Sequence, residues 1–130
     1  MPYVHLVIAL ALVEFIVFSL AVANARTRYN VPAPATSGHP AFERTFRAQM
    51  NTLEQLIVFV PAIVIFAHYL NPYLAAALGA VFIIGRAVFF AGYVRAAGAR
   101  HLGFNLSAIP NAALLLGAIF GALRALLAHG

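Results

Sequence analysis

The sequence predicts an all-α integral membrane protein in which four spanning helices form a left-handed four-helix bundle. The composition is far more apolar than that of a soluble domain, and the apolar residues gather in four runs. Of the 130 residues, 64% are hydrophobic and 8% are charged, and the mean hydropathy is +0.94. Soluble domains are about 45–50% apolar and about 25% charged. Apolar runs and their connectors occupy the whole length, so we expect a single domain over residues 1–130.

Four stretches of the chain are long enough to cross a bilayer. A transmembrane helix needs about 20 consecutive, mostly apolar residues. The stretches that meet this requirement are approximately residues 3–25, 51–70, 72–94 and 104–128. We do not expect the first to be a signal peptide, because it lacks a basic start, contains Glu14 and runs into an arginine-rich segment.

The connectors between these spans differ in character. Residues 26–50 include three prolines and are predicted to form an irregular loop. Asn71-Pro72 predicts a tight turn between the second and third spans. The third connector is bracketed by Gly98 and Gly103.

The basic residues are distributed unevenly among the connectors. The first connector carries four of the eight arginines, the third carries Arg95, Arg100 and His101, and the turn at Asn71 carries no charge. Cytoplasmic loops are enriched in basic residues, so we expect both basic connectors in the cytoplasm and both termini outside. The chain is rich in alanine and arginine and lacks lysine, which suggests a GC-rich genome and a bacterial inner membrane.

The composition also argues against several other classes of site. A nucleic-acid-binding protein groups its basic residues on a water-exposed face, whereas these residues bracket apolar helices. The chain has no cysteine, which excludes disulfides, thiolate metal sites and a thiol nucleophile of its own. The five histidines show no metal-ligand spacing. We therefore expect neither nucleic acid nor metal, and any thiol must come from a substrate.

The stretch that says most about function is residues 42–54, which leads directly into the second span. At about 100° per residue, Arg47, Asn51 and Glu54 fall within about 60° of one another on a helix. Ionisable groups at membrane depth are costly and by default mark a function. A guanidinium, an amide and a carboxylate on one stripe can hold a small zwitterion that carries carboxylates and an amine.

A second polar pattern follows the third span. Arg86, Tyr93 and Arg100 recur at intervals of seven, and such positions drift only about 20° per repeat on a helix. At about 1.5 Å per residue, Arg86 lies about 14 Å and Glu54 about 10 Å inside the membrane boundary. Arg86 can therefore pair with Glu54 or with Glu14, and the residues leave open whether its role is structural or functional.

Two motifs combine these residues. The first is Phe-Glu-Arg-Thr-Phe-Arg-Ala-Gln-Met-Asn-x-x-Glu over residues 42–54, and the second is Gly-Tyr-x-Arg over residues 92–95, followed by Arg100. Together with the length, the four spans, the long basic first connector and the short second turn, they resemble the MAPEG family, the membrane-associated proteins of eicosanoid and glutathione metabolism. The resemblance implies a homotrimer of four-helix subunits that binds glutathione between neighbouring subunits, near the cytoplasmic side.

The resemblance also implies roles for individual residues. Arg100 matches the catalytic arginine that activates the glutathione sulfur. The positions that match residues holding the tripeptide or lining its site are Arg26, Arg47, Gln49, Asn51, Glu54, Tyr93 and Arg95. Thr27, Gln55 and Phe89 stand where the leukotriene-forming branch has Arg, Tyr and Tyr, and these departures argue against eicosanoid chemistry.

The resemblance therefore implies a membrane-bound glutathione transferase with glutathione as co-substrate. The expected second substrate is a lipophilic electrophile, and reduction of lipid hydroperoxides is a second activity that the resemblance allows. The expected partners are membrane lipids and the other subunits of the homotrimer. Two alternatives remain open: a non-catalytic lipid- or glutathione-binding scaffold of the same family, and a small transporter or channel subunit with Arg86, Glu14 and Glu54 as a polar pathway.

Overall fold

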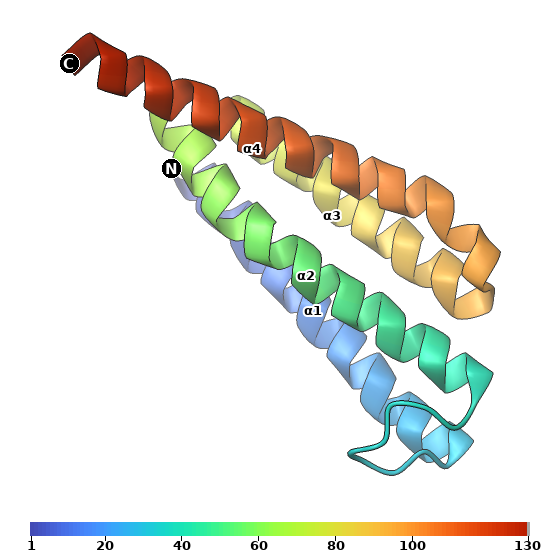
Figure 1. Cartoon of the computed structure of the whole chain (residues 1–130). Helices are drawn as coiled ribbons and strands as arrows, with labels where there is room; N and C mark the ends of the chain where they lie inside the picture. Colours follow the sequence, from blue (N-terminus) through green and yellow to red (C-terminus); the bar gives the residue numbers. More distant parts are fainter. Residues whose placement is uncertain (130) are drawn as a thin grey trace.

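Four long α-helices, each antiparallel to the next along the chain, build the fold (Figure 1). The computed structural model describes residues 1–129. The helices are α1 (Pro2–Tyr29), α2 (Pro40–Tyr69), α3 (Pro72–Arg95) and α4 (His101–His129), and one 3₁₀ turn, η1 (Ala97–Arg100), precedes α4. Residues 1–129 contain no strand. The predicted all-α four-helix bundle is therefore confirmed.

The helices extend beyond the predicted spans at the end that carries the basic connectors. Because α1 continues to Tyr29 and α2 begins at Pro40, the predicted irregular loop over residues 26–50 was wrong, and only residues 30–39 separate these helices. Pro40 occupies the first position of α2, where its missing N–H leaves no hydrogen bond unmade. His39 caps the helix, since its Nδ1 accepts a hydrogen bond from the backbone N–H of Ala41 at 3.1 Å. Gly103 likewise lies inside α4 and not at the edge of a connector.

The tight turn predicted at Asn71-Pro72 is present and caps α3. Asn71 Oδ1 accepts hydrogen bonds from the backbone N–H groups of Tyr73 at 2.8 Å and Leu74 at 3.1 Å. With this short turn, the alternating helices bring both chain termini to one end of the bundle (Figure 1). The loop of residues 30–39 and the η1 turn lie at the opposite end. The arginines that the sequence assigned to the first connector stand next to this loop, in the last turn of α1 and the first turns of α2.

α2 and α3 form the centre of the bundle, because each packs against the other and against both α1 and α4. The rings of Phe59 and Phe82 stack between them with centroids 4.1 Å apart, beside the fully buried Ile63. The outer surface is also apolar: Leu20 of α1 is 64% exposed and Leu127 of α4 is 78% exposed. All four helices are long and apolar enough to cross a membrane. The chain is therefore a membrane protein whose outer face requires lipid or another protein chain as cover.

α3 and α4 approach closely because a glycine of each helix faces the backbone of the other. A Cβ added to Gly85 of α3 would lie 2.5 Å from the backbone nitrogen of Ser107, and one added to Gly103 of α4 would collide with the backbone of Phe89. Close approach through small residues is typical of helix pairs in membranes. It brings the polar side chain of Ser107 against α3.

This contact predicts that Gly103→Ala destabilises the protein, whereas Gly98→Ala does not. The alanine methyl at position 103 meets the backbone of Phe89, which cannot move aside as a flexible side chain can. Overpacking of this kind costs about 1–3 kcal/mol. A Cβ at Gly98 has nothing within 4 Å, so the same substitution there is the matched control. Thermal unfolding in detergent measures both variants, and equal melting temperatures would contradict the packing described.

Candidate functional site

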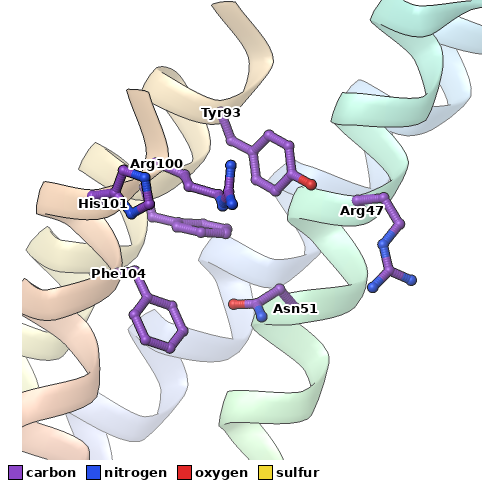
Figure 2. Close-up of a pocket in the computed structure, with 7 residues that line it drawn as sticks. Arg47, Asn51, Tyr93, Arg100, His101 and Phe104 are labelled. Atoms are coloured by element: carbon purple, nitrogen blue, oxygen red, sulfur yellow. The ribbon is translucent and has the colours of Figure 1, made fainter. Parts of the chain in front are cut away.

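A cavity of about 370 Å³ opens between α2, the end of α3 and the start of α4. Figure 2 shows Arg47 and Asn51 on the α2 side and Tyr93, Arg100 and Phe104 opposite them. The residues that line the cavity are Arg47, Asn51, Phe89, Tyr93, Arg100, His101 and Phe104. Four of the eight predicted site residues, from three elements, therefore meet in one cavity.

The α2 wall follows from helical spacing. Arg47 and Asn51 are four residues apart and so lie on the same face of α2, one turn from each other. Glu54 continues this stripe toward the membrane interior, but it lies beyond the cavity and its side chain is exposed. The three residues lie on one helix as predicted, and the first two of them, Arg47 and Asn51, line the cavity.

The opposite wall depends on the break between α3 and α4. α3 ends at Arg95, and the η1 turn directs Arg100 back over Tyr93, with the guanidinium carbon 5.6 Å from the ring centroid. The guanidinium also donates a hydrogen bond to the carbonyl of Ala97 within the same turn. The spacing predicted Tyr93 and Arg100 on one face of a continuous helix, which was wrong because α3 ends at Arg95; the η1 turn brings the two side chains together instead.

Arg86 lies beneath the cavity, with no exposed surface. Its guanidinium donates hydrogen bonds to three uncharged side chains: to Asn51 Oδ1 at 2.8 Å, to Thr52 Oγ1 at 3.1 and 3.3 Å, and to Ser107 Oγ at 3.0 Å. The guanidinium carbon also lies 4.1 Å from the centroid of the Phe89 ring. Of the alternatives that the sequence left open, a direct ion pair with Glu54 or Glu14 is not formed among residues 1–129. Hydroxyl and amide oxygens of α2 and α4 accept the hydrogen bonds of Arg86 in place of a carboxylate.

The lining of the cavity favours an anion. None of its seven residues is acidic, and two of them, Arg47 and Arg100, carry permanent positive charge. Arginine presents a planar fork of N–H donors that matches a carboxylate. Phe89 and Phe104 add an apolar wall. The cavity can therefore bind a ligand that combines carboxylates with a less polar part.

A second hollow, of about 270 Å³, adjoins this cavity between the start of α2 and the end of α3. It shares Arg47 and Tyr93 with the first, and its other lining residues are Pro40, Glu43, Arg44 and Ala97. Arg44 is held there by a hydrogen bond from its Nε to the carbonyl of Val94 at 3.2 Å. An elongated ligand can thus contact Arg47 from either side.

The other four predicted site residues lie outside the cavity. Arg26 donates hydrogen bonds to the carbonyls of the 30–39 loop at 2.7 and 3.3 Å. Gln49 donates from Nε2 to Ser19 Oγ at 2.9 Å and so ties α2 to α1. Glu54 and Arg95 are exposed on the outer surface. A single chain therefore brings together half of the predicted set.

The predicted set of site residues lacked three residues of the cavity, namely Phe89, His101 and Phe104. Phe89 had been noted only as a departure from the leukotriene-forming branch. His101 had been assigned to a basic loop and Phe104 to the start of a span. Since α4 begins at His101, the two residues are three apart on one helix, and Phe104 follows Arg100 by four. This spacing could have indicated that His101 and Phe104 lie near Arg100, but only once the start of α4 was known.

Comparison with known proteins identifies the class. A model of the MAPEG family matches residues 4–120, so the chain belongs to the MAPEG family.

Individual relatives match over most of the chain. An uncharacterized protein of Synechocystis is 43% identical over 118 residues, which cover 91% of this chain and 86% of that protein. Human microsomal glutathione S-transferase 2 is 45% identical over 103 residues, 78% of this chain and 70% of the human protein. Leukotriene C4 synthase of Cavia porcellus is 38% identical over 112 residues, 86% of this chain and 72% of that enzyme.

Proposed function

We propose that the chain is a membrane-bound glutathione transferase. The observation that carries the proposal is the convergence of Arg47, Asn51, Tyr93 and Arg100 on one cavity at the end of the bundle. Membership of the MAPEG family and similarity to a protein named microsomal glutathione S-transferase 2 support the same activity. Glutathione is the proposed co-substrate.

The charges of glutathione suit this part of the protein. The tripeptide carries two carboxylates, one ammonium group and one thiol. Arg47 can hold a carboxylate in a forked pair of hydrogen bonds, and the amide of Asn51 lies one turn away. Glu54, three residues after Asn51, is the acidic member of the stripe on α2 and is proposed to pair with the ammonium group.

Arg100 is proposed to stabilise the thiolate of glutathione. A free thiol has a pKa of about 8.5, and only the thiolate is an effective nucleophile. A cation beside the sulfur favours the charged form and so lowers that pKa. The thiolate then attacks an electrophilic carbon, a sulfur–carbon bond forms, and the electron pair of the broken bond leaves with the leaving group. Arginine suits this role because it remains protonated even where it is partly desolvated.

A homotrimer is proposed to complete the site. Arg26, Gln49, Glu54 and Arg95 match positions of the family's glutathione site, yet they lie outside the cavity of the single chain. Glu54 and Arg95 are exposed, so a neighbouring copy can bring them to a ligand bound at its own Arg47. The trimer would also cover part of the apolar outer face of the bundle.

The second substrate is proposed to be a lipophilic electrophile that enters from the bilayer. Such molecules concentrate in the membrane, and Phe89 and Phe104 give the cavity an apolar wall beside Arg100. Lipid hydroperoxides belong to the same physical class, so a further proposed activity is their reduction to an alcohol and water by two molecules of glutathione, which are oxidised to the disulfide. Both basic connectors are proposed to face the cytoplasm of a bacterium, where glutathione is dissolved.

Arg47→Ala is predicted to weaken glutathione binding by about ten- to a hundredfold or more. A hydrogen bond to a charged group contributes about 1.5–3 kcal/mol, and each 1.4 kcal/mol is about tenfold in affinity. Arg124→Ala is the matched control, because Arg124 lies toward the other end of α4 from the cavity and, among residues 1–129, its guanidinium donates a hydrogen bond only to the carbonyl of Tyr69. Titration calorimetry in detergent measures both, and an unchanged affinity in folded Arg47→Ala would place the binding site elsewhere.

Arg100→Ala is predicted to depress turnover far more than glutathione binding. The cation acts on the thiolate, whereas other residues hold the carboxylates and the amine. Arg100→Lys should keep part of the turnover because the positive charge remains although the fork is lost. Steady-state kinetics with a chromogenic electrophile test this. If the alanine variant turned over like the parent, Arg100 would have no part in catalysis.

A further inference from the structure

Arg86 is the largest fully buried side chain of the bundle, and one of its partners belongs to the cavity. Asn51 lines the cavity, and its Oδ1 accepts a hydrogen bond from Arg86 Nη2 at 2.8 Å. This is the shortest of the hydrogen bonds that Arg86 donates. The buried charge and the cavity therefore share one amide group.

The contact decides which end of that amide is available to a ligand. An asparagine amide can accept through Oδ1 or donate through Nδ2, and rotation about its last side-chain bond exchanges the two. The Arg86 guanidinium can only donate, so it holds the oxygen and leaves the nitrogen free. Among residues 1–129, Asn51 Nδ2 has no acceptor of its own.

The surroundings fix the guanidinium so that it can hold Asn51. Thr52 and Ser107 donate their own hydroxyl hydrogens to backbone carbonyls of their helices, Ala48 and Gly103, each at 3.0 Å. Their oxygens are thus left to accept from Arg86. Separate nitrogens of the arginine fork donate to α2 and to α4, a fixed planar geometry that the compact ammonium group of lysine does not reproduce.

We propose that Arg86 is a positioning residue that holds the Asn51 amide with its N–H₂ group toward the ligand. Arg47, Asn51 and Arg100 then all present hydrogen-bond donors to the cavity. A ligand with a carboxylate or carbonyl oxygen beside Asn51 is favoured, and a ligand with a donor group there is disfavoured. The choice of glutathione as the probe rests on the proposed function. The orientation of the amide does not depend on it.

A double-mutant cycle tests whether Arg86 acts through Asn51. Arg86→Met and Asn51→Ala are each expected to raise the Kd for glutathione about tenfold or more. The double variant should bind no worse than Asn51→Ala, because the effect of Arg86 passes through an amide that is already gone. If the two effects multiply, or if Arg86→Met binds like the parent, the proposal is wrong.

Two further variants separate positioning from a structural role. Arg86→Lys keeps a buried charge but loses the fork, so the variant should fold yet bind glutathione more weakly than the parent does. If it bound glutathione like the parent, the charge alone would matter and the proposed positioning of Asn51 would be wrong. Asn111→Leu removes a buried polar contact between α2 and α4, where Asn111 Nδ2 donates to Gln55 Oε1 at 3.0 Å; among residues 1–129, Asn111 makes no hydrogen bond to Arg86 or Asn51. This substitution should leave the Kd within about twofold of the parent's.

A spectroscopic readout keeps the inference distinct from the proposed function. In protein labelled with ¹⁵N-asparagine, the side-chain N–H₂ signals of Asn51 are those absent from the Asn51→Ala spectrum. They should shift in Arg86→Met and Arg86→Lys and stay in place in Asn111→Leu. This result would uphold the role of Arg86 even if the parent bound no glutathione. Unmoved Asn51 signals in both Arg86 variants would overturn it.

Discussion

The buried charge of Arg86 is the constraint on which the site depends. A cation at this depth in a membrane helix is unfavourable unless the protein supplies its hydrogen-bond partners. Here α2 and α4 supply them through Asn51, Thr52 and Ser107, and the close contact of Gly85 with the backbone at Ser107 lets α4 come near enough. The same interaction joins three helices and sets one wall of the cavity.

The arginines of this region have two different roles, one inside the protein and one in the cavity. Arg86 is enclosed and its donors are used inside the protein, so it does not line an open polar pathway. Arg47 and Arg100 remain accessible in the cavity, where they can meet a ligand. The enclosure of Arg86 supports a binding site more than a channel, and the apolar walls of Phe89 and Phe104 beside Arg100 suit chemistry on a lipophilic partner.

Much of the fold was predictable because membrane helices must be long and apolar, which shows directly in the sequence. The helix ends were less predictable, since Pro40 and Gly103 were taken as parts of connectors although one begins α2 and the other packs inside α4. Helical spacing was enough to place Arg47 with Asn51. It could not show that the cavity ends before Glu54, or that Arg86 bonds to neutral groups, because both depend on how neighbouring helices pack.

The candidate site was predicted only in part, because its geometry also depends on helix ends and on packing. Tyr93 and Arg100 were expected on one face, and the η1 turn brings them together by a route that spacing alone does not describe. His101 and Phe104 were missed because the start of α4 was placed too late. Arg26 and Gln49 make contacts within their own chain, and their proposed place in the glutathione site depends on an assembly that one sequence cannot show.

Whether the cavity stabilises the thiolate of glutathione is tested most directly by the ultraviolet absorbance of the thiolate when glutathione is added to the purified protein at neutral pH. A thiol with a pKa of about 8.5 is mostly protonated under these conditions, so free glutathione contributes little of this signal. The proposed transferase predicts a saturable rise in thiolate absorbance as glutathione binds. If glutathione bound without this rise, or did not bind at all, the cavity would not be a site that stabilises the glutathione thiolate.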